Sequence, residues 1–365
     1  MKHGRVYKKE GFYTGWPLPS ILPDGRLSVV VQSAPRPEHY ALGQRITLVS
    51  DDEGESWQES DDPTIPSNWP ATSTREGHDR FERILPSGRY FTAGGVSYEQ
   101  WSSDRRQEAE SLGLNVVNHP DPNSGMIVVG GHKVYIQWSD DSGQTWSRQQ
   151  WRIPRSYRLN GFPRPAYLED GTILAPLYDI AEGPAKDGGT TYVFRVENEK
   201  DCELIEMPGA GRGGNEFALI ETQPGTVLAM IRDAEGKAEG YLLESWSHDS
   251  GRSWSHPLQT PVWGYPPHML KLRDGRILCV YSYRRDPMGI RAVLSSDGGR
   301  SWDMDNEIIL RDDAVATRGK RVGQNSSSDL GYPLSVQLSD GTIFTTYYFV
   351  EADGIVHCAW TKWQA

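Results

Sequence analysis

Side chains that can transfer protons or bind anions gather where short apolar runs of this chain begin and end. Histidine, glutamate and tyrosine can act as general acids, bases or nucleophiles, and arginine forms paired hydrogen bonds with carboxylates. The starts of apolar runs carry His78, Asp79, Arg80, Arg164, Glu216, His268 and Tyr332. The ends of neighbouring runs carry Asp179, Arg232, Arg284, Arg285 and Tyr348. A fold that brings these positions to one mouth would form a pocket for a polar substrate.

The apolar runs come in pairs, and a tight turn with a glycine joins each pair. The turn glycines are Gly25, Gly88, Gly171, Gly225, Gly275 and Gly341, and successive ones lie 50 to 83 residues apart. Runs such as 173–177 and 277–281 are apolar almost throughout, which indicates strands buried on both faces. This spacing leaves room for about four strands per repeat, as in propeller blades. We therefore predict an all-β fold, a single six-bladed β-propeller domain over residues 1–365.

A second motif, Ser-x-Asp-x-Gly-x-(Ser/Thr)-Trp, occurs four times and starts at Ser50, Ser139, Ser247 and Ser295. Its Ser and Asp side chains can bond to the backbone of their own turn, and its Trp can pack on the sheet. We interpret these aspartates as turn-forming residues rather than as acids or calcium ligands. If the glycine turns join strands 1 and 2 of each blade and this motif joins strands 3 and 4, both lie on one rim. The titratable residues above would then share the other rim.

The composition argues against several classes of partner and cofactor. A net charge of −11 over 365 residues disfavours nucleic acid and anionic membranes as partners. Three widely spaced cysteines, without His/Cys/Asp clusters at ligand spacing, predict neither disulfides nor a bound transition metal or other cofactor, while a structural calcium stays open. The first residues carry no basic stretch followed by an apolar one, so we expect a cytoplasmic protein.

These motifs resemble the Asp-box, or BNR, repeats of the sialidase (neuraminidase) superfamily of propellers. In that family a tyrosine at a strand start is the nucleophile, a glutamate at another strand start activates it, and three arginines hold the sialic acid carboxylate. The stretch Gly331-Tyr332-Pro333-Leu334-Ser335 resembles the tyrosine motif, and Glu216, with Arg232 one hairpin later, resembles the glutamate and the second arginine. The resemblance implies that Tyr332 is the nucleophile, Glu216 its base and Arg232 a substrate clamp.

The chain departs from the sialidase pattern at three places. Pro17 stands where the first arginine is expected, and residues 346–349 lack the glutamate that supports that arginine. The loop of residues 33–40 lacks the acid/base aspartate, and Glu38 or His39 is its candidate replacement. The third arginine corresponds to one of three residues between which the sequence does not choose, Arg291, Arg284 or Arg285.

Other polar residues at the same rim could compensate for these losses. Arg80, Arg164 and Arg232 would suit an acidic sugar, because guanidinium groups bind carboxylates at two points. His78 beside Asp79 is a further candidate for a general acid or base. The substrate-binding candidates also include His268, Tyr348 and Asp179. The alternative for each is an ordinary hydrogen-bonded or packed residue of the rim.

Residues 97–114 form an insertion in the second repeat. Charged residues alternate there with Trp101, Ala109, Leu112 and Leu114, which predicts a short helix within a long loop.

These observations predict a sialidase-like, exo-acting glycoside hydrolase whose partner is an oligosaccharide or glycoconjugate, with an acidic sugar as one option. Sialidase activity itself is not expected, because Pro17 interrupts the carboxylate clamp. One alternative is a propeller lyase, in which His78, His268 or Tyr332 moves a proton and arginines neutralise a uronate. The other is a non-catalytic carbohydrate-binding or interaction propeller, since a fold does not determine function. The residues make no prediction of the oligomeric state.

Overall fold

The structure is a computed structural model that describes residues 1–22, 24–37, 39, 43–62, 83–84, 87–114, 116–119, 122–142, 144–152, 159–161, 165–179, 190–209, 214–233, 239–315 and 329–365. Its internal contacts divide the chain into two units. Unit 1 comprises Met1–Ser67, Gly240–Leu242 and Thr260–Ala365, and unit 2 comprises Asn68–Glu239 and Leu243–Gln259. The described strands pair antiparallel into six sheets of four or five strands, which confirms the all-β prediction.

Unit 1 contains three sheets of four strands each. The first has the order β1-β26-β25-β24, with β1 (Lys2–Tyr7), β26 (Val356–Trp363), β25 (Ile343–Val350) and β24 (Gly331–Gln337). The second has the order β2-β3-β4-β5, with β2 (Tyr13–Ile21), β3 (Leu27–Ala34), β4 (Gln44–Ser50) and β5 (Gln58–Glu59). The third has the order β20-β21-β22-β23, with β20 (Pro267–Lys271), β21 (Ile277–Tyr283), β22 (Gly289–Ser295) and β23 (Ile308–Arg311). A 3₁₀ turn, η3 (Met304–Asn306), precedes β23.

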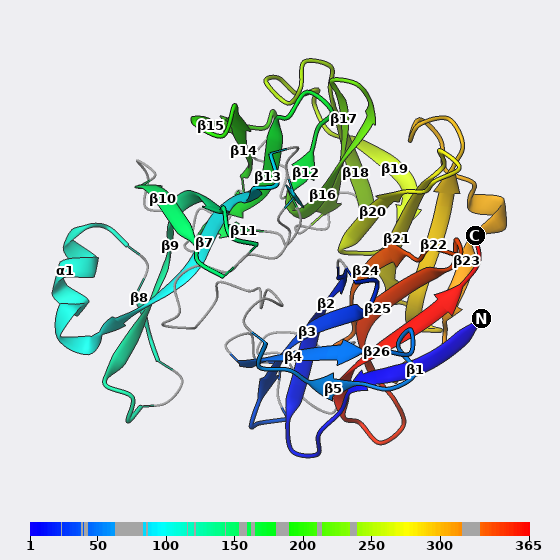
Figure 1. Ribbon diagram of the computed structural model, residues 1–365, viewed down its shortest axis with the longest axis horizontal. Helices are drawn as coiled ribbons and strands as arrows, with labels where there is room; N and C mark the ends of the chain where they lie inside the picture. The colour runs from blue at the N-terminus through cyan, green and yellow to red at the C-terminus, as the bar shows by residue number, and fades with distance from the viewer. Residues whose placement is uncertain are drawn as a thin grey trace. The chain divides into compact units, whose positions relative to one another are not determined.

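The first sheet joins the two ends of the chain, because β1 pairs with β26 along Lys2 to Tyr7. Figure 1 shows β1, in blue, beside β26, in red. The sequence repeats begin only near residue 16, so this outer strand was not predicted. Pairing a terminal strand with the last strand satisfies backbone groups that would otherwise form an exposed sheet edge.

The core of unit 1 lies on both faces of this first sheet. On one face Tyr348, Phe344 and Trp360 pack against Val29 and Val31 of the second sheet. On the other face a second cluster joins it to the third sheet through Tyr347, Phe349, Trp363, Leu278 and Val280. All eight residues of β25 are buried, as expected for a strand covered on both faces.

Unit 2 contains the other three sheets. The first has the order β10-β9-β7-β6 with β8 on β9, and consists of β6 (Arg83–Ile84), β7 (Tyr90–Ser102), β8 (Val116–Asn118), β9 (Met126–Ser139) and β10 (Ser147–Arg152). The second has the order β11-β13-β14-β15 with β12 on β13, and consists of β11 (Leu159–Gly161), β12 (Ala166–Tyr167), β13 (Ile173–Asp179), β14 (Thr191–Glu197) and β15 (Asp201–Glu206). The third has the order β16-β17-β18-β19, with β16 (Gly214–Gln223), β17 (Thr226–Asp233), β18 (Tyr241–Ser247) and β19 (Leu258–Trp263). Residues 240–242 and 260–263 of its outer strands are counted with unit 1.

The insertion at residues 97–114 is helical over a shorter range than predicted. Residues 97–102 continue β7, whose backbone pairs with β9, and only η1 (Ser103–Arg105) and α1 (Arg106–Ser111) are helical. Figure 1 shows α1 in the connection that follows β7. Ala109 anchors this connection in a small cluster with Leu114, Ile127 and Val129. Among the described residues, no helix combines the length and the hydropathy that a membrane crossing requires.

The two repeated turns occupy the predicted places in the sheets. Each of the six turn glycines has a positive φ, from 73° at Gly225 to 92° at Gly341. These turns connect β2 to β3, β6 to β7, β12 to β13, β16 to β17, β20 to β21 and β24 to β25. The Ser-x-Asp motifs connect β4 to β5, β9 to β10, β18 to β19 and β22 to β23. In the first of them, Ser56 donates its backbone N–H and its hydroxyl to Asp52 at 2.8 and 2.6 Å. The aspartates therefore bond to their own turns, which agrees with a turn-forming role.

These bonds make the turns sensitive to acid. Hydroxyl donors hold the pKa of Asp52, Asp141 and Asp297 at about 2, below the ordinary 3.8. Because the folded-state pKa is depressed, their stabilising contribution is complete above pH 3.8 and is lost as the pH falls towards 2. We expect thermal unfolding of the wild type to move to lower temperature across this window. Asp297→Asn should unfold earlier than wild type at pH 5 and show a smaller further loss on acidification. Equal pH dependence of the two proteins would contradict this prediction.

Candidate functional site

Three of the strands that precede a glycine turn, β2, β16 and β24, begin with the same irregularity. It is a β-bulge that follows a glycine. In β2 the register shifts between Gly15 and Leu18, in β16 between Gly214 and Phe217, and in β24 between Gly331 and Leu334. In each case two residues of the first strand lie opposite one residue of the second. A bulge of this kind bends the strand and redirects side chains, and bulges are common beside active sites. The residues displaced in this way are Trp16 and Pro17, Asn215 and Glu216, and Tyr332 and Pro333.

In unit 1 the displaced aromatic residues adopt left-handed backbone. Trp16 has a φ of 52° and Tyr332 a φ of 50°. This conformation costs a bulky residue about 1–2 kcal/mol, and such outliers concentrate at functional sites. In both bulges a proline follows, and proline has no N–H to leave unpaired where the ladder is broken.

The two bulges present their aromatic rings to one another. The ring centroids of Trp16 and Tyr332 are 6.2 Å apart in an edge-on arrangement. Tyr348, the β25 residue paired with Gly331, lies 5.7 Å from both rings and is nearly parallel to Tyr332, at 27°. Tyr348 is fully buried, whereas Tyr332 is half-buried. Tyr348 therefore forms the floor of an aromatic surface, and Tyr332 reaches solvent.

A histidine and an aspartate lie against the same surface. The centroid of His39 is 5.2 Å from those of Trp16 and Tyr13. Nδ1 of His39 lies 2.9 and 3.0 Å from the two carboxylate oxygens of Asp329. The Tyr13 hydroxyl donates to Oδ1 of Asp329 at 3.1 Å and lies 2.9 Å from Nδ1. Asp329 is 6% exposed and the His39 side chain 26% exposed, so the carboxylate lies behind the imidazole.

Arg284 supports the start of β24. Its Nε and Nη2 donate to the carbonyl of Leu330 at 3.2 and 2.9 Å. The next residue, Gly331, approaches Ser282 so closely that a β-carbon would lie 1.9 Å from the Ser282 hydroxyl oxygen. These contacts hold the backbone that carries Tyr332, a role that the sequence did not suggest for Arg284.

The other two candidates for the third arginine contact aromatic rings. Arg285 lies 3.9 Å from the ring centre of Trp263, and Arg291 lies 3.5 Å from that of Tyr283. Arg291 also forms an ion pair with Glu307, to which the Tyr281 hydroxyl donates a hydrogen bond. Arg291 is thus occupied by a partner within its own sheet, while Arg285 remains exposed.

His268 is a buried, hydrogen-bonded residue. It is 4% exposed, and its Nδ1 accepts a hydrogen bond from the backbone N–H of Ser335 at 3.2 Å. This contact ties β20 to β24 and leaves Nε2 as the protonated nitrogen of the neutral ring.

In unit 2 the structure pairs two of the predicted residues with each other. The Glu216 carboxylate and the Arg232 guanidinium form an ion pair, and their side chains are 8% and 17% exposed. The bulge explains the pairing, because it places Asn215 and Glu216 opposite Arg232. The Asn215 side chain accepts the Glu216 backbone N–H at 2.6 Å. Asp179 ends β13, as predicted for the end of a second strand.

Three residues of this site were not predicted from the sequence. They are Trp16 of the aromatic surface, and Tyr13 and Asp329, which contact His39. Trp16 and Tyr332 share the pattern Gly-aromatic-Pro, and this repeat could have identified Trp16. Tyr13 and Asp329 carried no such signal, since their contact with His39 spans 26 and 290 residues. The remaining candidates lie outside the described residues: Glu38, His78, Asp79, Arg80 and Arg164.

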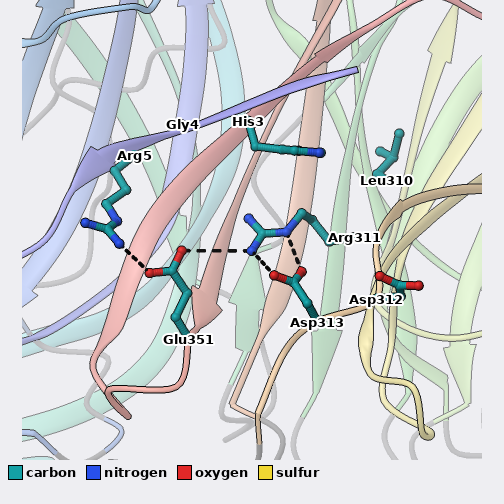
Figure 2. Close-up of a pocket in the computed structure, with 8 residues that line it drawn as sticks. All are labelled: His3, Gly4, Arg5, Leu310, Arg311, Asp312, Asp313 and Glu351. Atoms are coloured by element: carbon teal, nitrogen blue, oxygen red, sulfur yellow. Dashed lines mark hydrogen bonds and ion pairs between the residues drawn. The ribbon is translucent and has the colours of Figure 1, made fainter.

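A separate pocket of about 590 Å³ lies in unit 1 beside β1, β23 and the end of β25. Figure 2 shows that the side chains of Arg5, Glu351, Arg311 and Asp313 point at one another. Arg5 donates to Glu351 at 2.7 Å, and Arg311 donates to both oxygens of Asp313 at 2.6 and 2.7 Å. The hydrogen bond from Arg311 is the main reason that the pKa of Asp313 is lowered. These ion pairs join β1 to its neighbours. In the described part of the chain, no three His, Cys, Asp or Glu side chains are grouped to hold a metal ion.

Comparison with known proteins identifies a family that the chain matches. The model of the BNR repeat-like domain matches residues 111–345. No protein of curated function matches the chain. Among solved structures, a protein of unknown function from Dyadobacter fermentans is 21% identical with a TM-score of 0.70, over 99% of this chain and 97% of that one.

Two enzymes also have a similar fold. The NanB sialidase of Streptococcus pneumoniae has a TM-score of 0.57 at 11% identity, over 98% of this chain and 70% of its own. The α-L-arabinanase of Penicillium chrysogenum, complexed with arabinobiose, has a TM-score of 0.57 at 14% identity, over 99% and 98%. These likenesses show a sialidase- and arabinanase-like β-propeller fold, and the number of six blades stays a prediction.

The close approach at the β24 bulge gives a stability prediction. In Gly331→Ala, the new methyl overlaps Ser282 and the backbone keeps a φ of 129°. We expect about 1–3 kcal/mol of overpacking in addition to about 1–2 kcal/mol of backbone strain, measured by urea unfolding. Gly341→Ala is the control, since its φ is 92° but nothing lies within 4 Å of the added carbon. Adding Ser282→Gly to Gly331→Ala should recover the overpacking part. Equal losses in the two alanine variants would refute the overlap.

The ion pair between Glu216 and Arg232 in unit 2 gives a second stability prediction. Arg232→Met leaves the buried Glu216 carboxylate without its partner charge, and we expect a loss of about 3–5 kcal/mol in urea unfolding. The double variant Arg232→Met/Glu216→Gln should recover much of this loss, because it removes the uncompensated charge. Lys2→Met is the control: its 2.6 Å pair with Glu55 is exposed, at 63% and 37%, so its loss should stay below about 1 kcal/mol. A double variant as unstable as Arg232→Met would show that the ion pair is not the cause.

Proposed function

Because the chain belongs to the family of BNR repeat-like domains, we propose that it is a glycoside hydrolase that releases a sugar from the end of an oligosaccharide. The fold is shared with a sialidase and an arabinanase, and fold alone does not fix the reaction. The proposal therefore depends on the side chains of the aromatic surface in unit 1.

The observation that carries the proposal is the placement of Tyr332. This tyrosine lies at the start of β24, adopts strained left-handed backbone, and is half-buried against Trp16 and Tyr348. Glycine on one side and proline on the other hold it there, with Arg284 on the carbonyl before the glycine. A structural tyrosine would reach the same packing without this strain, whereas a reactive group benefits from a fixed orientation.

We assign Tyr332 as the nucleophile that attacks the anomeric carbon. On the sialidase resemblance alone, Glu216 is proposed as the base of the reaction. Arg232, the ion-pair partner of Glu216, then orients this carboxylate. A tyrosine hydroxyl is a weak nucleophile at neutral pH, so an adjacent base is the usual means of activation.

Trp16 bears on the choice of sugar. Its indole is the neighbour of Tyr332 in the bulge of β2, and Pro17 follows it. An aromatic ring binds the C–H face of a sugar by apolar contact and brings no charge for a carboxylate. Trp16 is 8% exposed, so only an edge of its indole can reach a ligand. We therefore propose that a neutral ring binds at Tyr332 against this edge, and that an acidic group of the substrate would be bound elsewhere.

The test is a screen of aryl glycosides of sialic acid, uronic acids, arabinose and neutral hexoses with purified full-length protein. Wild type should release the aryl group from at least one neutral sugar. Tyr332→Phe should abolish this release, and Glu216→Gln should reduce kcat by about 10²–10⁴-fold, the usual contribution of a general base. Tyr7→Phe removes the hydroxyl of a half-buried tyrosine of β1 and should retain wild-type rates.

Other outcomes separate the alternatives. An ultraviolet-absorbing product from uronate oligosaccharides would identify a lyase and refute hydrolysis. A wild-type protein that binds oligosaccharides but cleaves none would make the propeller a binding protein. Full activity of Tyr332→Phe would remove Tyr332 from the mechanism.

A further inference from the structure

The contact between His39 and Asp329 has the geometry of a histidine held for proton transfer. Both carboxylate oxygens lie within 3.0 Å of Nδ1, so Nδ1 carries a proton and donates it to Asp329. In the neutral ring Nε2 is then the nitrogen that can accept a proton, and in the imidazolium it is the nitrogen that can donate one. The hydrogen bond therefore selects which atom of the ring does the chemistry.

The two members of the pair differ in their exposure to solvent, with Asp329 buried and His39 partly exposed. Asp329 is 6% exposed, and the Tyr13 hydroxyl donates to it from the buried side, since Tyr13 is 1% exposed. The His39 side chain is 26% exposed. A buried carboxylate with two donors is held rigidly, and it orients the ring that lies between it and solvent.

The position of the ring joins the pair to the proposed reaction site. The His39 ring is in edge-on contact with Trp16, at 5.2 Å between centroids, and Trp16 in turn contacts Tyr332. Trp16 is 8% exposed, whereas Tyr332 and His39 are both partly exposed, so a sugar that binds over this indole would have the tyrosine and the imidazole as neighbours. Around His39, the described titratable groups in contact are Asp329 and Tyr13, with Tyr348 next to Tyr13 at 6.4 Å.

We propose that His39 is the general acid and base of this site and that Asp329 and Tyr13 are its positioning residues. The inference rests on the proposed glycoside hydrolase function and adds a proton donor from the loop of residues 33–40, which lacks the aspartate of the sialidase pattern. The signal for His39 in the sequence was its place in that loop, and the structure adds its partners.

The proton balance of the step is simple. Nε2–H of the imidazolium donates its proton to the glycosidic oxygen while the bond from the anomeric carbon to that oxygen breaks. The bonding electron pair stays on the oxygen, which leaves as a neutral alcohol. Tyr332 gives its hydroxyl proton to the proposed base and bonds through its oxygen to the anomeric carbon. The neutral imidazole then takes a proton from a water molecule, whose oxygen bonds to the anomeric carbon and displaces the tyrosine oxygen. The tyrosine takes its proton back from the base, and the ring is again an imidazolium.

Leaving-group dependence tests this role. His39→Gln should lower kcat by about 10²–10⁴-fold on a sugar linked to an alkyl alcohol or to a second sugar, which needs a proton to leave. The same variant should lose far less on the bond-breaking step of a dinitrophenyl glycoside, because a dinitrophenolate leaves without protonation. Sodium azide, which needs no base, should restore turnover of that substrate. Asp329→Asn should also lose more activity on the alkyl-linked or sugar-linked substrate than on the dinitrophenyl glycoside. Each loss should be smaller than in His39→Gln.

A structural histidine would give a different pattern. Equal losses on both leaving groups in His39→Gln, without rescue by azide, would overturn the proposal. The control is His256→Gln, an exposed histidine of a turn in unit 2, which should retain wild-type rates on every substrate. A wild type that cleaves no glycoside would refute the proposed function itself, a result distinct from either pattern.

A spectroscopic measurement tests the pair without any turnover. In wild-type protein labelled with ¹⁵N-histidine, the neutral His39 ring should show Nδ1 protonated and Nε2 unprotonated. Asp329→Leu, which removes the acceptor, should move this ring towards the Nε2-protonated tautomer. A wild-type His39 with an unprotonated Nδ1 would overturn the proposal even if the enzyme is active.

Discussion

The candidate site in unit 1 depends on left-handed backbone at two bulky residues, Trp16 and Tyr332. Each costs about 1–2 kcal/mol and persists only because its surroundings leave no alternative. A glycine before and a proline after each residue, the broken ladder of the bulge, and the packing of both rings on Tyr348 supply that constraint. Without the bulges, the side chains at the starts of β2 and β24 would follow the ordinary alternation of a strand and would not meet.

Three of the arginines that the sequence singled out are engaged with the protein itself. Arg291 pairs with Glu307, Arg284 holds the carbonyl of Leu330, and in unit 2 Arg232 pairs with Glu216. A guanidinium with a protein partner has less to offer a substrate carboxylate. The described side chains of the aromatic surface in unit 1 are rings and an imidazole, which suit apolar contact and proton transfer better than the binding of a fixed charge.

Local features of the fold were predictable, and distant pairings were not. A glycine that adopts positive φ indicates a tight turn, and the Ser and Asp of the second motif form hydrogen bonds to residues only a few positions away. Both kinds of turn therefore lie where they were predicted. By contrast, β1 pairs with β26, more than 350 residues away in some contacts, and nothing in the repeats indicates it. The helix of the insertion began later than predicted, because β9 satisfies the backbone of residues 97–102 as a strand.

The sequence by itself determined the all-β class, the repeated hairpins and the positions of Tyr332, Glu216 and His39 at strand starts or in the loop that follows, because periodicity and turn chemistry act over short distances. Only the tertiary structure decided which of these groups have partners. Asp329 reaches His39 across 290 residues, and Ser282 approaches Gly331 closely enough to exclude any side chain there. Such contacts join segments that are far apart in the sequence, and they leave no pattern along the chain.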